Sequence, residues 1–230
     1  MFKLNNLLAA VAVLFAASSL TACGESAGAV SGSKFFGDVP ALYLQMMEKK
    51  ADIKEQFKNA SSEGEAKDLM TQAQQFEDDY RVQIQNAASD LTGKTIEVVS
   101  TDDFTVNTPL TMTFDGFFSK SDMTPQLKFT GEVVAARDYQ SDDAKGITDA
   151  GGDLSRYVGL AQHIYLEGYD DQGNQVFSSQ VGYAPLGLSG DGQLLVKTGT
   201  PVKFDNLTIN KKNAEGCLKA TSLRLVYSKK

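Results

Sequence analysis

The chain has 230 residues, of which 42% are hydrophobic and 22% charged, and this composition is typical of a globular protein. Acidic side chains outnumber basic ones by 29 to 22, so the net charge at neutral pH is −7. A protein of this charge repels the phosphate backbone of nucleic acids. We therefore expect no nucleic-acid partner.

The first 22 residues have the organisation of a signal peptide. Lys3 supplies a positive charge, and the apolar run from Leu7 to Leu20 that follows it is too short to serve as a permanent transmembrane helix. Small residues come next, before Cys23. Without residues 1–22, 21 basic side chains face 29 acidic ones, and the net charge becomes −8.

The segment Leu20-Thr21-Ala22-Cys23 resembles the lipobox of bacterial lipoproteins. The resemblance implies that the Cys23 thiol receives a diacylglycerol and that cleavage before Cys23 makes it the first residue of the mature chain. Two or more acyl chains give stable membrane anchoring. The residue after the cysteine is Gly24 and not Asp. By analogy with the sorting of lipoproteins in many bacteria with two membranes, this residue implies transfer to the outer membrane. The alternative is an ordinary secretory signal that leaves Cys23 unmodified.

Residues 23–38 are predicted to form a flexible tether. The stretch from Gly24 to Lys34 is rich in Gly, Ser and Ala and has no apolar periodicity, a composition typical of flexible linkers.

Residues 39–92 are predicted to form a helical hairpin. Good helix-forming residues dominate this region, and apolar residues recur three and four positions apart from Leu69 to Leu91, which is the spacing of an amphipathic helix. The sequence around Gly64 predicts a turn, and Ser62 with Glu65 has the spacing of a capping box.

The apolar stripe of this hairpin has two interpretations. It packs within the protein, or it binds a partner protein or a second copy. The first helix carries more apolar residues than one narrow seam needs, and methionine is frequent on adaptable binding surfaces. We therefore predict an outward-facing contact surface at Tyr43, Met46 and Met47.

After Gly93 the apolar pattern changes from helical spacing to alternation. Alternating runs such as Leu110 to Asp115 and Leu223 to Tyr227 predict antiparallel strands with one buried face. Residues Asp170 to Asn174 predict a hairpin turn. The predicted fold class is α+β, with the helical hairpin attached to a β-sandwich at residues 93–230 that folds by itself.

The segment from Tyr165 to Phe177, together with the earlier strand from Lys128 to Val133, resembles FxLYD-type immunoglobulin-like modules of prokaryotic exported proteins. The resemblance covers at most Thr124 to the C-terminus, and Gly168 departs from its pattern. It implies an immunoglobulin-like sandwich with a binding or structural role and contributes no catalytic residue.

No motif in the sequence indicates catalysis, so we expect neither an enzyme nor a bound cofactor or metal. His163 is the only histidine, which leaves histidine-based metal sites and catalytic triads without partners. Cys217 is predicted to be a small buried residue. The acidic pairs are interpreted as solvated turns rather than calcium ligands; they are Asp102-Asp103, Asp142-Asp143, Asp170-Asp171 and the run from Asp149 to Asp153.

Two function classes remain open. The favoured one is a membrane-tethered lipoprotein of the cell envelope that acts as a structural or protein-interaction module with an envelope protein as partner. The alternative is a surface module that binds carbohydrate or a divalent cation, for which aromatic side chains would provide a stacking platform; the candidates are Phe117, Phe118, Tyr139, Tyr157 and Tyr169.

Overall fold

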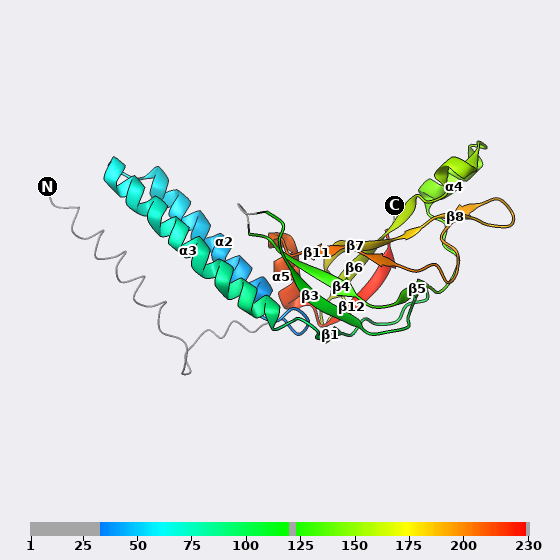
Figure 1. Ribbon diagram of the computed structural model, residues 1–230, viewed down its shortest axis with the longest axis horizontal. Coiled ribbons are helices and arrows are strands. Elements are labelled where there is room, and N and C mark those ends of the chain that lie inside the picture. The colour runs from blue at the N-terminus through cyan, green and yellow to red at the C-terminus, as the bar shows by residue number, and fades with distance from the viewer. Residues whose placement is uncertain (1–32, 120–122, 229–230) are drawn as a thin grey trace. The chain divides into compact units, whose positions relative to one another are not determined.

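The computed structural model describes residues 33–119 and 123–228, and the predicted signal peptide and the first part of the predicted tether lie outside them. Two long helices come first: α2 (Val39–Lys58) and α3 (Glu63–Ser89). They lie side by side and are joined by a short turn, so the predicted helical hairpin is confirmed (Figure 1).

The turn between these helices is fixed by side-chain caps. Ser62 Oγ accepts a hydrogen bond from the Glu65 backbone N–H at 3.2 Å, as the predicted capping box requires. The Glu65 carboxylate, however, accepts from the backbone N–H and the hydroxyl of Ser61, both at 2.8 Å, and not from Ser62. The N-terminal cap of α3 therefore uses two consecutive serines.

Strands make up most of the remaining chain, with three further helical segments among them. The strands are β1 (Thr95–Ile96), β2 (Phe104–Val106), β3 (Leu110–Phe117), β4 (Pro125–Thr130), β5 (Val133–Ala135), β6 (Ala161–Tyr169), β7 (Gln175–Pro185), β8 (Gly187–Leu188), β9 (Leu194–Leu195), β10 (Lys203–Phe204), β11 (Asn206–Thr208) and β12 (Ser222–Tyr227). The helical segments are α4 (Asp142–Asp149), the 3-10 helix η1 (Leu154–Tyr157) and α5 (Lys211–Lys219).

The strands form two antiparallel four-stranded sheets, of order β1-β3-β4-β11 and β10-β7-β6-β12, and two small two-stranded sheets. The two large sheets meet at both edges. At one edge the Val99 N–H, shortly after β1, donates to the Leu223 carbonyl of β12 at 2.8 Å, and at the other edge only Asp205 separates β10 from β11, which belong to different sheets. The fold is therefore an α+β fold in which two connected antiparallel sheets share a core.

One predicted strand is divided in the structure. The strand predicted from Lys128 to Val133 ends at Thr130, and Val133 begins β5, which pairs with β2 and not with β3. Residues 202–209 form β10 and β11, which belong to different sheets. The predicted turn at Asp170 is confirmed, because its carboxylate accepts from the backbone N–H groups of Gln172 and Asn174.

The end of the predicted tether belongs to the folded body. Ser33 and Gly37 pair across a tight turn, and Phe36 between them is fully buried. Its ring packs edge to face against the ring of Phe177 on β7, with centroids 6.0 Å apart. The prediction of a flexible tether is thus wrong for residues 33–38, because two consecutive aromatic rings, Phe35 and Phe36, gain more from burial than the turn loses in entropy.

Gly168, which interrupted the immunoglobulin-like pattern, has a packing role. It pairs with Phe177 across β6 and β7, and a Cβ atom at Gly168 would lie 2.2 Å from the Phe177 ring. The missing side chain lets that ring lie over the backbone and reach Phe36. A glycine at this position is therefore required by close approach.

The helical hairpin and the sheets share one hydrophobic core. Residues 33–119 and 123–228 belong to a single compact unit, and its core cluster extends from Phe35 to Tyr227. The first turns of α2 pack on α5, and the end of α3 packs on β3. Gly93 marks the change from helix to strand in the sequence but not a boundary between two cores.

Candidate interaction surface on the hairpin

The predicted partner-binding residues are mostly inside the protein. Tyr43 is 3% exposed, Met46 is 0% exposed, and Met47 is half-buried against the core. The Tyr43 hydroxyl lies 3.2 Å from Thr124 Oγ1, in hydrogen-bond distance of the segment before β4. The prediction of an outward-facing surface at these residues is wrong, because this part of α2 packs against α5.

Near the turn of the hairpin, the apolar stripes of α2 and α3 are less deeply buried than at its base. Between the second half of α2 and the first half of α3 lies an open groove of about 190 Å³. Its apolar lining comes from both helices: Ile53, Phe57, Leu69, Met70, Ala73 and Phe76. Phe57 is 46% exposed and Met70 is 64% exposed, so the groove ends in two large apolar side chains in contact with solvent.

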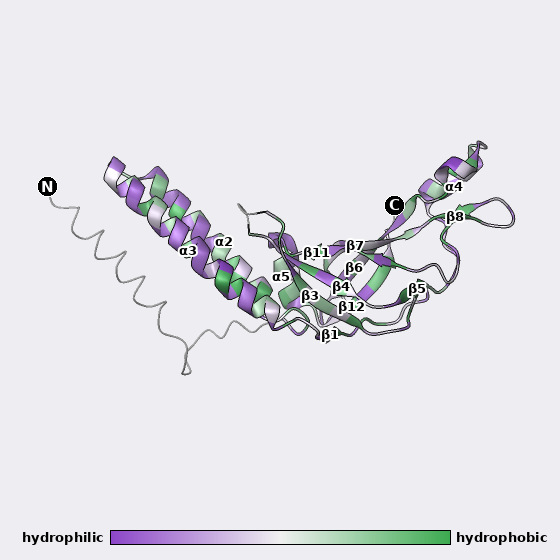
Figure 2. Cartoon of the chain, viewed as in Figure 1, coloured by the Kyte–Doolittle hydropathy of each residue, from purple (hydrophilic) through white to green (hydrophobic). Residues whose placement is uncertain are grey.

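Charged groups border this groove. Lys50 Nζ lies 2.8 Å from a carboxylate oxygen of Glu77, which joins α2 to α3 at one end of the groove. Lys54 also lines it. Lys49 approaches the Phe76 ring, with Nζ 5.9 Å from the ring centroid. Figure 2 shows hydrophilic residues over most of both helices, interrupted by short hydrophobic stretches. The groove is therefore an apolar strip with a charged rim.

Sequence reasoning found part of this surface. The spacing of three and four that starts at Leu69 places Leu69, Ala73 and Phe76 on the apolar stripe of the second helix. It missed Met70, which follows Leu69 directly and therefore lies about 100° around the helix from it, on the border of the stripe. Only the position of α2 beside α3 shows that Met70 lines the groove.

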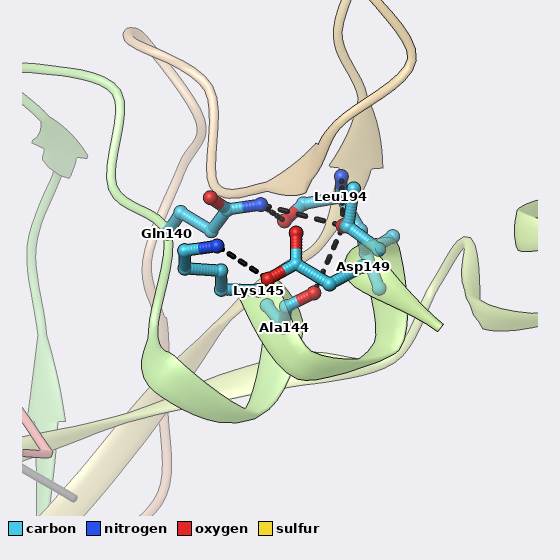
Figure 3. A network of polar contacts seen from close by, with 6 residues as sticks. Gln140, Ala144, Lys145, Asp149 and Leu194 are labelled. Carbon is cyan, nitrogen blue, oxygen red and sulfur yellow. Dashed lines mark hydrogen bonds and ion pairs between the residues drawn. The ribbon is translucent and has the colours of Figure 1, made fainter. Parts of the chain in front are cut away.

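A second open pocket, of about 570 Å³, lies beside α4. Its lining includes the carboxylates of Asp142 and Asp143 and the ring of Tyr157. Two hydrogen bonds of Gln140 help to hold α4 in place: its side-chain amide donates to Thr148 Oγ1 and to the Leu194 carbonyl, each at 3.3 Å. Figure 3 shows this network and the ion pair between Lys145 and Asp149 on the same helix.

Three of the other acidic residues singled out in the sequence each engage a different local partner. Asp103 pairs with Arg137 at 2.6 Å, and Asp153 caps η1 by accepting from the Ser155 N–H. Asp170 holds a hairpin turn. Within residues 33–119 and 123–228, no group of three His, Cys, Asp or Glu side chains could hold a metal ion.

The remaining candidate residues are dispersed. His163 lies on β6 and is exposed. Tyr139 stacks on Tyr227 with centroids 3.9 Å apart, while Tyr169 packs under the guanidinium of Arg224. The structure thus gives these tyrosines separate neighbours and does not bring them into one platform.

Cys217 lies on α5 and is fully buried, as predicted. Burial raises the pKa of its thiol well above the ordinary value, because the thiolate would lose its hydration. A Cβ atom at the neighbouring Gly216 would lie 2.4 Å from the Val176 carbonyl oxygen, so α5 rests directly on β7. The thiol is therefore a packing group.

Cys23 lies outside the described residues, so the structure gives no geometry for the predicted lipid attachment. In the part of the chain that the structure does describe, no helix combines the length and the apolar character needed to cross a membrane. Comparisons with protein-family models, with curated proteins and with solved structures each returned no match.

Proposed function

We propose that this protein is a lipid-anchored lipoprotein of the cell envelope that acts as a structural or protein-interaction module. The observation that carries the proposal is the segment Leu20-Thr21-Ala22-Cys23 after a basic and apolar leader. In a host with two membranes the proposed destination is the outer membrane, because Gly24 follows the cysteine. Catalysis has no part in the proposal.

The proposal includes a finer description of the fold, an immunoglobulin-like β-sandwich of the FxLYD type. Two four-stranded antiparallel sheets with a common core support the sandwich. The β6–β7 hairpin with its Asp170 turn supports the resemblance, since it contains the segment that suggested it.

The interaction surface in this proposal is the groove of the hairpin. At the base of α2, Tyr43 and Met46 are buried in the core. At the other end of the two helices, Phe57 and Met70 expose apolar side chains to solvent. An exposed apolar patch with a polar rim is typical of a protein-interaction site. The envelope partner would therefore contact the end of the hairpin near the turn between α2 and α3.

Replacing Cys23 with Ala tests the lipid anchor. The variant loses the only proposed acceptor of the acyl chains, so we expect no incorporation of labelled palmitate and no partition into the detergent phase. The measurement is metabolic labelling with fractionation of the same cells, and Cys217→Ala is the matched control, which should keep both signals. Retention of the lipid label by the Cys23→Ala protein would show that the anchor is elsewhere.

The alternative function, a surface module for carbohydrate or a divalent cation, is favoured by one observation. Asp142, Asp143 and Tyr157 line one pocket beside α4, and aromatic and carboxylate groups together suit a sugar, while carboxylate oxygens suit calcium. A titration with calcium or with oligosaccharides that shifted the Tyr157 ring resonances at micromolar concentration would favour this function over the first.

A further inference from the structure

We propose that the partner of the groove is a second copy of this protein, and that two hairpins pair with a two-fold axis parallel to their helices. The groove is defined above by Ile53, Phe57, Leu69, Met70, Ala73 and Phe76 with its rim at Lys50, Lys54 and Glu77. The inference deepens the proposed function and rests on it for the membrane anchor.

Charge is the first argument for a second copy. α2 has four basic side chains against three acidic ones, a net charge of +1, and α3 has two against six, a net charge of −4. At the groove itself α2 contributes Lys50 and Lys54 to the rim and α3 contributes Glu77, so the surface has a basic edge on α2 beside an acidic edge on α3. Such a surface is complementary to itself, as an interface between two identical subunits requires.

Charge also selects between the two ways of pairing the hairpins face to face. A two-fold axis parallel to the helices places α2 of one copy over α3 of the other. An axis across the helices places α2 over α2 and α3 over α3, which brings like charges together. The first arrangement is therefore favoured by electrostatic complementarity.

The positions of the apolar residues along the helix axes agree with the first arrangement. The Lys50–Glu77 ion pair fixes the level at which the antiparallel helices pass each other. Phe57 lies two turns beyond Lys50 and Met70 two turns before Glu77. Phe57 and Met70 are consequently at one level, and a parallel two-fold axis brings Phe57 of each copy onto Met70 of the other, a favourable contact between sulfur and an aromatic ring.

The small size of the surface limits the strength of the dimer. Two helices side by side are about 20 Å wide, and the twelve residues from Met47 to Lys58 are about 18 Å long, which gives about 350 Å² per copy. Stable complexes bury about 800 Å² per partner. We therefore expect a weak dimer in dilute solution and a populated one where lipid anchors concentrate the protein on a membrane.

The geometry is tested by cross-linking in cells that express two differently tagged full-length copies, one with Phe57→Cys and one with Met70→Cys. With a short bismaleimide we expect the mixed pair to cross-link at least fivefold more than either variant paired with itself. The buried Cys217 does not react, and the parent chain without the new cysteines measures the background. A pair of Phe57→Cys copies that cross-linked better than the mixed pair would overturn the parallel axis.

The surface is tested by charge substitution on one helix. Met70→Glu is compared with Val82→Glu, because Met70 is 64% exposed in the groove and Val82 is 56% exposed and does not line it. Both changes are on the surface and should leave the melting temperature within about 2 °C of wild type. We expect at least a fivefold loss of co-precipitation between tagged copies for Met70→Glu and no loss for Val82→Glu.

Fractionation of the same cells separates this inference from the proposed function. Membrane-bound protein that neither cross-links as the mixed pair nor loses co-precipitation with Met70→Glu would overturn the dimer and leave the anchor intact. Protein found in the soluble fraction would overturn the anchor. The same cross-linking, repeated with soluble protein at high concentration, would then test the dimer: a preferred mixed pair would support it, and no mixed pair would overturn it. An equal loss of co-precipitation for Val82→Glu would overturn the assignment of the groove.

Discussion

Replacing Met46 with Glu is expected to unfold a large fraction of the protein at moderate temperature. Met46 is fully buried in the core, so the substitution removes apolar packing and places a carboxyl group where water does not reach it. We expect a loss of about 4 kcal/mol or more in the free energy of unfolding, which lowers the melting temperature by about 10 °C. Thermal unfolding followed by circular dichroism measures it.

The neighbouring residue provides the control. Met47 is only half-buried, so its carboxyl in Met47→Glu can reach water, and we expect a loss of about 1 kcal/mol. A Met46→Glu protein that melted like wild type would contradict the packing of α2 on the body, and it would restore the earlier interpretation of this face as an exposed surface.

A fragment of residues 94–230 is expected to lack a cooperative unfolding transition. It loses Phe36, Met46, Ile84 and Ala88, all fully buried in the shared core. Each large buried side chain contributes about 1.5–3 kcal/mol, and several together approach the whole net stability of about 5–15 kcal/mol. Circular dichroism and thermal melting of the purified fragment measure the loss.

The fragment of residues 31–230 is the control, because it contains the complete compact unit and should melt like the mature protein. Adding a peptide of residues 33–92 to the shorter fragment should restore part of the structure. A 94–230 fragment that was soluble and melted cooperatively would show that the sheets form a core without the hairpin.

The sequence contained enough local information for several of the elements but not for their burial. Spacing alone predicted α3 and the cap at Ser62, and alternation predicted β3 and β12. In α2, however, Met46 and Phe57 lie on the same stripe. One is buried and the other exposed because α5 covers the first part of the helix only. That cover comes from residues more than 150 positions away.

The helix α5 illustrates a second limit. Its sequence begins with two lysines and contains Gly216, which is unfavourable inside a helix. The close approach of Gly216 to the Val176 carbonyl explains the glycine, and nothing in the local pattern indicates it. Helices of this length depend on tertiary packing for their stability, so their prediction requires the fold.

The central proposal is that the base of the hairpin belongs to the core while its far half forms a contact surface when the protein is anchored to a membrane, as proposed above. Hydrogen–deuterium exchange of the lipid-anchored protein in vesicles, compared with the Cys23→Ala protein in dilute solution, tests it most directly. We expect peptides from residues 47–58 and 63–76 to exchange more slowly on the membrane and peptides from residues 39–46 and 84–91 to exchange equally in both. Equal exchange along the whole hairpin, or a difference confined to its base, would contradict the claim.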